Sequence, residues 1–176
     1  MSRIMQEKIE VPDGVEAKVE GKRVEVSGKK GKLSREFDLP GLGIKADGRV
    51  ITLEIASPRR RNRAALGAVR AHLLNMIKGV TEGFVYKLRT VYSHFPITVK
   101  VEGKRVMIHN FLGERSPRVA EIVGDVAVEV KGDEIIVSGI NKEEVGQTAF
   151  NIEQATSVKY RDRRIFQDGC YIAERS

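Results

Sequence analysis

A six-residue sequence occurs twice in this chain. VEGKRV is found at Val19–Val24 and again at Val101–Val106, 82 residues further along a chain of 176 residues. Solenoid repeats run to about 20–50 residues, so a period this long indicates a duplicated domain. In each copy, alternating residues flank a Gly-Lys pair, which predicts two strands joined by a tight turn. The hexapeptide is therefore interpreted as a hairpin that marks the register of the repeat.

Both copies are predicted to contain several strands followed by one helix. The expected strands are 9–11, 17–19, 23–27, 33–39 and 50–55 in the first copy, and 84–92, 97–101, 105–109, 126–130, 134–139 and 170–173 in the second. Gly41-Leu42-Gly43 is interpreted as a turn. The first helix is expected to start at Ser57-Pro58 or Asn62 and to stop at Gly79, because apolar residues recur there at helical spacing. Asn141–Glu144 is a capping box, which predicts the second helix.

Four arginines lie between the last strand and the helix of the first copy: Arg59, Arg60, Arg61 and Arg63. Cations at a helix N-terminus oppose the helix dipole, which favours anions. The number of residues that separates matching positions of the two copies falls by five here. The first copy therefore carries an insertion, which is assigned to this loop. The repeated scaffold does not need this insertion, which favours the interpretation that the loop is a binding site for RNA or protein. The alternative is a solvated basic loop.

The segment after the second helix has no counterpart in the first copy. It carries Lys159, Tyr160, Arg161, Arg163 and Arg164, so that basic residues alternate with an aromatic ring. Ammonium and guanidinium groups contact phosphates, and rings stack on unpaired bases, which makes this pattern typical of RNA binding. The alternative is a C-terminal strand with a solvated basic face.

The net charge of +7 and the pI of about 9.6 favour a polyanionic partner. The first 81 residues carry all of the net charge, whereas the charges of the second half cancel but remain segregated along it. No run approaches the roughly 18 apolar residues of a membrane helix. The N-terminus lacks a secretory pattern, and Cys170 is the single cysteine, so a reducing cytoplasm is expected.

No catalytic, cofactor-binding or metal-binding residues are predicted. The sequence contains none of the spacings HExxH, Walker A, CxxC or GxSxG. His72, His94 and His109 have no ligand or nucleophile at a recognisable spacing, and Cys170 is expected to be buried or half-buried. An enzyme is therefore not expected.

Two longer motifs resemble a known family. NMIKGVTEGF at Asn75–Phe84 is similar to the middle signature of the large-subunit ribosomal protein L-six family (universal L-six, whose eukaryotic counterpart is called L-nine). The run from Gln154 to Arg175 resembles the C-terminal signature of the archaeal and eukaryotic form, and Phe95-Pro96 follows that form as well. The resemblance spans essentially the whole chain.

The resemblance implies an α+β fold, a duplicated domain in which each copy packs small antiparallel β-sheets with one α-helix around a single core. The expected domains are 1–81 and 82–176, the second with a basic RNA-binding tail. The implied partner is large-subunit rRNA near the stalk base and the sarcin–ricin region, with neighbouring ribosomal proteins and proximity to translational GTPases. Neither DNA nor a membrane is expected. The implied location is the ribosome of the cytoplasm.

Two other classes of function remain open at this stage. One is a tandem protein-interaction module outside the ribosome, with sheet edges or the acidic stretch Glu121–Glu144 as the docking surface. The other is a small enzyme on the duplicated scaffold, which would need a pocket holding His94 or His109 with a carboxylate.

Overall fold

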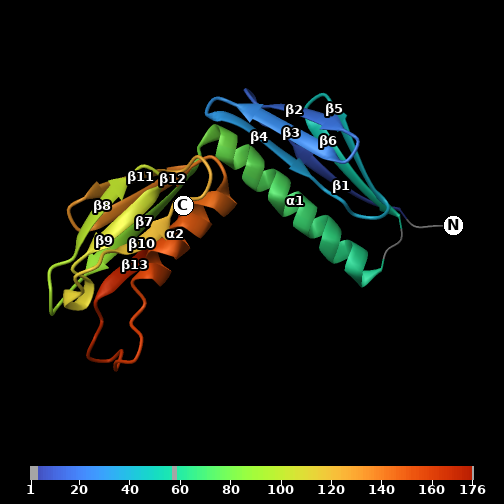
Figure 1. Cartoon of the computed structure of the whole chain (residues 1–176). Helices are drawn as coiled ribbons and strands as arrows, with labels where there is room; N and C mark the ends of the chain where they lie inside the picture. Colours follow the sequence, from blue (N-terminus) through green and yellow to red (C-terminus); the bar gives the residue numbers. More distant parts are fainter. Residues whose placement is uncertain (1–3, 57–58, 176) are drawn as a thin grey trace. The chain divides into compact units, whose positions relative to one another are not determined.

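The computed structural model describes residues 4–56 and 59–175, and the chain divides into two compact units, Met1–Gly83 and Phe84–Ser176 (Figure 1). Each unit has its own hydrophobic core, two antiparallel sheets and one long helix. The chain is therefore an α+β protein in which one plan is used twice, as the repeat indicates.

The first unit contains two three-stranded sheets, with strand orders β1-β6-β5 and β2-β3-β4. The elements are β1 Ile4–Glu10, β2 Glu16–Glu20, β3 Arg23–Gly28, β4 Gly31–Glu36, β5 Leu42–Asp47, β6 Val50–Ala56 and α1 Arg60–Thr81. The buried faces of β3 and β6 supply the strand side of the core, and α1 covers them with the stripe that includes Leu66, Leu73 and Val80.

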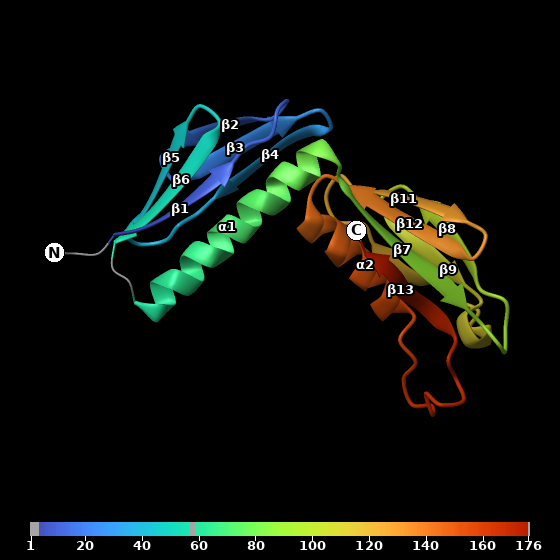
Figure 2. The same ribbon diagram turned by 180° about the vertical axis from the view of Figure 1, so that it is seen from behind.

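The second unit contains a four-stranded sheet, β11-β12-β7-β13, and a three-stranded sheet, β10-β9-β8. The elements are β7 Phe84–Val91, β8 Thr98–Glu102, β9 Arg105–His109, the 3₁₀ turn η1 Phe111–Gly113, β10 Arg118–Glu121, β11 Ala127–Lys131, β12 Glu134–Gly139, α2 Lys142–Ala155 and β13 Gly169–Arg175. The helix α2 lies across one face of the four-stranded sheet and ends beside β13 (Figure 2).

The repeated hexapeptide forms the same hairpin in both units, as predicted. In the first unit Glu20 pairs with Arg23, and in the second Glu102 pairs with Arg105. The glycine of each turn has a positive φ, +63° at Gly21 and +61° at Gly103. Glycine adopts this conformation without the steric cost that a Cβ would add, so the Gly-Lys pair fixes the turn and with it the register.

The boundaries predicted for α1 were wrong at both ends. The helix begins at Arg60, and Asn62 lies in its first turn, where the side-chain amide donates to the carbonyl of Ala56 at 3.1 Å. The helix passes through Gly79 and ends at Thr81. The stop signal is Gly83, whose φ is +77° and whose N–H donates to the carbonyl of Lys78. A glycine just past the last turn is the usual way to satisfy these terminal carbonyls.

The five extra residues of the first copy are mostly helical, which corrects their assignment to a loop. Leu66 lies six residues after the first residue of α1, whereas its counterpart Val145 lies three residues after the first residue of α2. The first copy therefore begins its helix almost one turn earlier. Arg60 and Arg61 lie on this extra turn, Arg63 matches the first residue of α2, and Arg59 is the N-cap residue.

Two strands were missed by sequence reasoning. The strand β5 begins at Leu42, inside the segment interpreted as a turn, because only Gly41 takes the left-handed conformation there. The strand β10 lies in Arg118–Glu121, where only Ala120 is fully buried. Both are edge strands with few buried side chains, so they lack a clear alternation of apolar residues and their pairing partner determines the structure.

The capping box of α2 is partly as expected. The side-chain carbonyl of Asn141 accepts from the N–H of Glu143 at 3.1 Å. The carboxylate of Glu144 accepts from the side-chain amide of Asn141 at 3.0 Å, in place of the main-chain N–H that a reciprocal box would use. The cap residue is thus held from both sides, and the start of α2 is well defined.

Candidate nucleic-acid interface

The loop between α2 and β13, residues 156–168, contains all five residues predicted to bind RNA. It extends beyond the ends of the helix and the strand that it connects (Figure 1). The two ends of the loop are joined by Thr156, which is buried and whose hydroxyl accepts from the N–H of Cys170 at 2.9 Å. The same hydroxyl donates to the carbonyl of Glu153 at 3.1 Å, which closes the last turn of α2.

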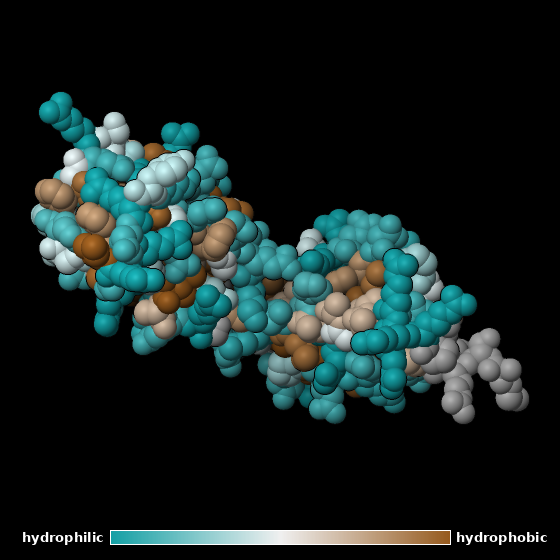
Figure 3. Space-filling view, turned by 90° about the horizontal axis from the view of Figure 1, so that it is seen from below, coloured by the Kyte–Doolittle hydropathy of each residue, from teal (hydrophilic) through white to brown (hydrophobic). Residues whose placement is uncertain are grey.

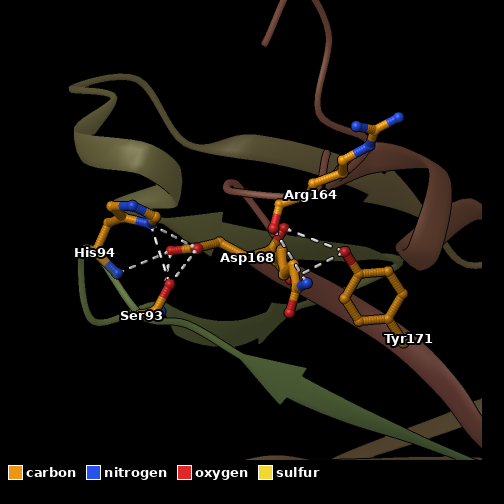
Figure 4. A network of polar contacts seen from close by, with 6 residues as sticks. Ser93, His94, Arg164, Asp168 and Tyr171 are labelled. Carbon is orange, nitrogen blue, oxygen red and sulfur yellow. Dashed lines mark hydrogen bonds and ion pairs between the residues drawn. The ribbon is translucent and has the colours of Figure 1, made fainter. Parts of the chain in front are cut away.

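Asp168 anchors the C-terminal end of the loop to the segment after β7 (Figure 4). Its side chain is fully buried, and it accepts four hydrogen bonds from two residues. The N–H groups of Ser93 and His94 donate to Oδ2 at 3.3 and 3.2 Å, and the Ser93 hydroxyl donates to Oδ1 at 3.1 Å. The His94 Nδ1 lies 2.9 Å from the same Oδ1. Burial alone would raise the pKa of Asp168, but these hydrogen bonds outweigh it and hold the pKa below its ordinary value.

This serine, histidine and aspartate are not arranged as a catalytic triad. The Ser93 hydroxyl and the His94 Nδ1 lie 3.1 Å apart and share one oxygen of Asp168. A triad needs the serine on one ring nitrogen and the carboxylate on the other, so that the imidazole can carry a proton between them. In addition, the His94 ring stacks on Phe166 with centroids 4.7 Å apart. The group therefore fixes the loop in place.

Phe166 is held between two cationic or ionisable partners. The His94 ring stacks on Phe166, and the Arg161 guanidinium lies 4.8 Å from the centroid of the same ring. A guanidinium over an aromatic face is attracted by the ring quadrupole. Arg161 is therefore held over the loop by its own aromatic contact, with its charge still exposed to solvent.

A tight turn at Asp162 presents Arg163 and Arg164. The Asp162 carboxylate accepts from the N–H of Arg164 at 2.9 Å, and its main-chain carbonyl accepts from the N–H groups of Ile165 and Phe166. The Tyr171 hydroxyl donates to the carbonyl of Gln167 at 3.0 Å, which ties the returning chain to β13. The carboxylate of Asp162 is thus used by the main chain of the turn.

Arg118 fixes the N-terminal end of the loop. Its guanidinium donates to the carbonyls of Ala155 and Ser157 at 2.9 and 3.1 Å, and it forms a bidentate pair with Glu114 at 2.8 and 2.7 Å. The hydrogen bonds of Arg118 lower the pKa of Glu114 below its ordinary value, against the effect of burial. The Arg118 guanidinium also lies 4.3 Å from the Phe111 ring centroid. The end of α2 is therefore joined to β10 through this one side chain.

The outer surface of the loop is cationic and open. Lys159, Arg161, Arg163 and Arg164 are all exposed, and within residues 4–56 and 59–175 none of them forms an ion pair. Tyr160 has the positive φ of +61° and a relative exposure of 103%. A tyrosine gains nothing from packing in that position, so its ring is available to a partner. The structure thus brings the five predicted residues together on one loop whose inner contacts hold it in shape.

The second predicted group, Arg59, Arg60, Arg61 and Arg63, surrounds the N-terminus of α1. All four are exposed, the first turn contains no acidic residue, and Arg59 makes no side-chain cap. A shallow cleft beside them is lined by Leu39, Pro40 and Ile55. Ser57 and Pro58, which were expected to start the helix, lie outside the described residues. The N-terminus of the helix and the four arginines make this end of α1 attractive to an anion.

Sequence reasoning missed the residues that hold the loop. Neither Asp168 nor Arg118 was predicted to hold the loop, and His94 was considered only for the pocket of a possible enzyme. These three side chains come from positions up to 74 residues apart, so no local spacing reports their contacts. The prediction that Cys170 is buried is confirmed, and burial raises the pKa of its thiol.

The described residues contain no group of three or more His, Cys, Asp or Glu side chains that could hold a metal ion. In the part of the chain that the structure describes, no helix is long and apolar enough to cross a membrane.

The fold and this loop define a duplicated α+β protein with a cationic, aromatic surface in its second unit. The family model described as Ribosomal protein L6 matches the chain twice, over residues 11–83 and 95–169, and the chain belongs to that family. Curated relatives are named large ribosomal subunit protein uL6. That of Methanothrix thermoacetophila is 52% identical over 168 residues, 96% of each chain. That of Methanococcus vannielii is 49% identical and covers 100% of this chain and 97% of its own. That of Aeropyrum pernix is 51% identical over 170 residues, 96% of this chain and 93% of its own.

Proposed function

We propose that this chain is a non-catalytic structural constituent of the large ribosomal subunit and binds large-subunit rRNA through the loop between α2 and β13. The observation that carries the proposal is the structure of that loop. Asp168 and Phe166 of the loop, together with Arg118 of β10, are all used in fixing its shape. Of its outer side chains, Arg161 also lies over Phe166, whereas Lys159, Tyr160, Arg163 and Arg164 have no such use within the described residues. The names of the relatives, which are large-subunit ribosomal proteins, also support the proposal.

The bound RNA is proposed to lie near the stalk base and the sarcin–ricin region, with neighbouring ribosomal proteins and close to the docking place of translational GTPases. The support is the family resemblance, together with the relatives' names. The protein would act in ribosomes of the cytoplasm. The arginine-bearing end of α1 is proposed as a second contact surface, for RNA or for a neighbouring protein.

Contacts to phosphate dominate in this proposal. Folded RNA is recognised mainly through its shape, its phosphates and its unpaired bases, because side chains cannot read its deep major groove. Four cations that each contact a phosphate give a log–log salt slope of about −3 to −4. Binding that is nearly independent of salt would refute this mechanism.

The test uses the full chain and large-subunit rRNA in a filter-binding assay at several salt concentrations. The double variant Arg163→Ala/Arg164→Ala removes two exposed cations and leaves Arg161 on Phe166. The matched control is Lys100→Ala/Arg105→Ala, which removes two exposed cations from the sheet β10-β9-β8. The loop variant is expected to reduce the salt slope by roughly 1.5 and the control to leave it unchanged.

Exposed charges contribute little to folding, so both double variants are expected to unfold like the wild type. A loop variant that folds normally and binds rRNA with unchanged affinity would contradict the proposed site. The end of α1 would then be the next candidate. Sedimentation of the native protein adds an independent check, since it should move with large subunits at low salt and be partly released at high salt.

A further inference from the structure

A cleft of about 380 Å³ lies between the C-terminal half of α2 and the cationic loop. Phe150 and Glu153 line it from the helix, Arg163 and Phe166 from the loop, and Tyr171 from β13. Small-molecule sites begin at about 300 Å³, so a cleft of this size takes one group no larger than a nucleoside. Arg163 belongs both to the cleft and to the outer loop surface described above, so the cleft opens beside the cations.

The walls of the cleft are aromatic and unusually exposed. Phe150 is 47% exposed and Tyr171 is 42% exposed. Of the ten large hydrophobic side chains that are exposed among the described residues, nine belong to the second unit and only Leu74 to the first. Figure 3 shows apolar side chains between hydrophilic ones on the surface of each unit. Exposed rings that gather beside cations indicate a surface for a flat, anionic ligand.

The ring of Tyr171 is held in a fixed orientation. Its hydroxyl donates to the carbonyl of Gln167 at 3.0 Å, and the carbonyl of Asp168 lies 3.5 Å away (Figure 4). Phe166, at the base of the same cleft, is fixed by the stacked His94 ring. A platform that is already oriented loses little conformational entropy when a base stacks on it. The rings are therefore built to receive a planar group.

The polar edge of the cleft favours a particular kind of base. One carboxylate oxygen of Glu153, Oε1, accepts from the N–H of Ile172 at 3.2 Å, which orients the carboxylate and leaves Oε2 as an acceptor. A carboxylate accepts hydrogen bonds from the exocyclic amino groups of bases, as in its pairing with the cytosine amino group. Uracil has no such amino group, so the edge disfavours it. Arg163 lies on the opposite side and suits the phosphate of the same nucleotide.

We propose that this cleft binds one unpaired nucleotide of RNA with an exocyclic amino group, stacked between Phe150 and Tyr171. The proposal rests on the proposed function, because the loop cations are needed to bring the RNA backbone to the cleft. It adds a stacking contact with partial base selectivity to a surface that otherwise recognises phosphate.

The principal variant is Phe150→Ala in the full chain, since an exposed helical position tolerates alanine without loss of the fold. Leu74→Ala is the matched control, because Leu74 is a helical residue with 42% exposure in the other unit. Loss of a stacking ring is expected to weaken binding to large-subunit rRNA about 5- to 150-fold. The salt slope should stay unchanged, because no phosphate contact is removed. Phe150→Tyr should retain the affinity and Phe150→Leu should lose it.

A second measurement uses pentanucleotides of adenosine, cytidine or uridine at low salt, titrated against the wild type. Uridine is expected to bind most weakly, and Glu153→Gln should reduce the difference. Equal affinity for all three would overturn the base preference, and unchanged rRNA affinity of Phe150→Ala would overturn the stacking site. If that variant binds rRNA normally but fails to enter subunits, a neighbouring protein occupies the cleft and the proposal is wrong. These outcomes differ from failure of the proposed function, which is reported by the Arg163/Arg164 double variant.

Discussion

Replacement of Asp168 by asparagine tests whether the buried carboxylate holds the binding loop in place. The substitution keeps the shape of the side chain, but one of its two terminal atoms becomes an NH₂ donor. Each oxygen of Asp168 accepts two hydrogen bonds: Oδ2 from the main-chain N–H groups of Ser93 and His94, and Oδ1 from their side chains. The amide carbonyl is expected to keep the two main-chain donors, which cannot accept a hydrogen bond. The NH₂ group then replaces Oδ1, so the hydrogen bonds that the Ser93 hydroxyl and the His94 Nδ1 make to the carboxylate are lost.

The expected cost follows from those two lost hydrogen bonds. A hydrogen bond to a charged group contributes roughly 1.5–3 kcal/mol. Ser93 and His94 are exposed, so their freed donors can reach water and the lower figure applies. Asp168→Asn should thus lower the free energy of unfolding of the second unit by about 3 kcal/mol. With a urea m-value of about 1–3 kcal/mol per molar, the midpoint falls by about 1–3 M.

Cys170 provides an assay that reports on the second unit alone. It is the only cysteine and its side chain is fully buried, so a thiol reagent labels it only when that unit opens. Pulse labelling across a urea series gives the midpoint for wild type, for Asp168→Asn and for Asp125→Asn, which removes an equal charge from an exposed site. An Asp168→Asn midpoint equal to that of the Asp125 control would refute the anchoring role of the carboxylate.

Two further predictions concern pH and a glycine. The pKa of Asp168 and that of Glu114 are lowered in the folded protein. The two carboxylates therefore stabilise the fold fully above their ordinary pKa values of 3.8 and 4.5, and this stabilisation is lost as the pH falls through their lowered pKa values. Urea midpoints should therefore fall steeply below about pH 4, and a flat profile would contradict this. Gly124→Ala should lower the stability measured by calorimetry more than Gly132→Ala does. Both glycines have a positive φ, at which an alanine costs about 1–2 kcal/mol, but only at Gly124 would the added Cβ collide with the carboxylate of Glu144. Equal losses would show that the Glu144 contact costs nothing.

The duplication and most of the strands could be predicted because they depend on local patterns. The turn of the hexapeptide needs only a glycine at one position, and the stripe of Leu66, Leu73 and Val80 needs only helical spacing. The start of α1 was missed for a physical reason. An arginine is a good helix former but a poor cap, and without a capping side chain at Arg59 the sequence gives no sign of where the helix begins.

The five RNA-binding candidates could be listed from the sequence, but the contacts that shape their loop could not. Phe166 follows the basic residues in the sequence, and in the structure it is half-buried between His94 and Arg161. Its partner His94 is 72 residues away in the chain. Such a contact depends on the pairing of β13 with β7, which brings the two segments together, and no periodicity in either segment reports it.

The loop exists because the second unit adds a strand that the first unit lacks. In the first unit β1 is the edge of its sheet, and exposed Lys8 and Glu10 lie along it, which discourages pairing with other chains. In the second unit the corresponding strand β7 is internal, because β13 pairs with its outer edge. The chain that leaves α2 must therefore travel to the far end of β7 before it can run antiparallel to that strand. That return path is the segment with the cations, so the surface proposed to bind RNA follows from the appended strand and not from the repeat itself.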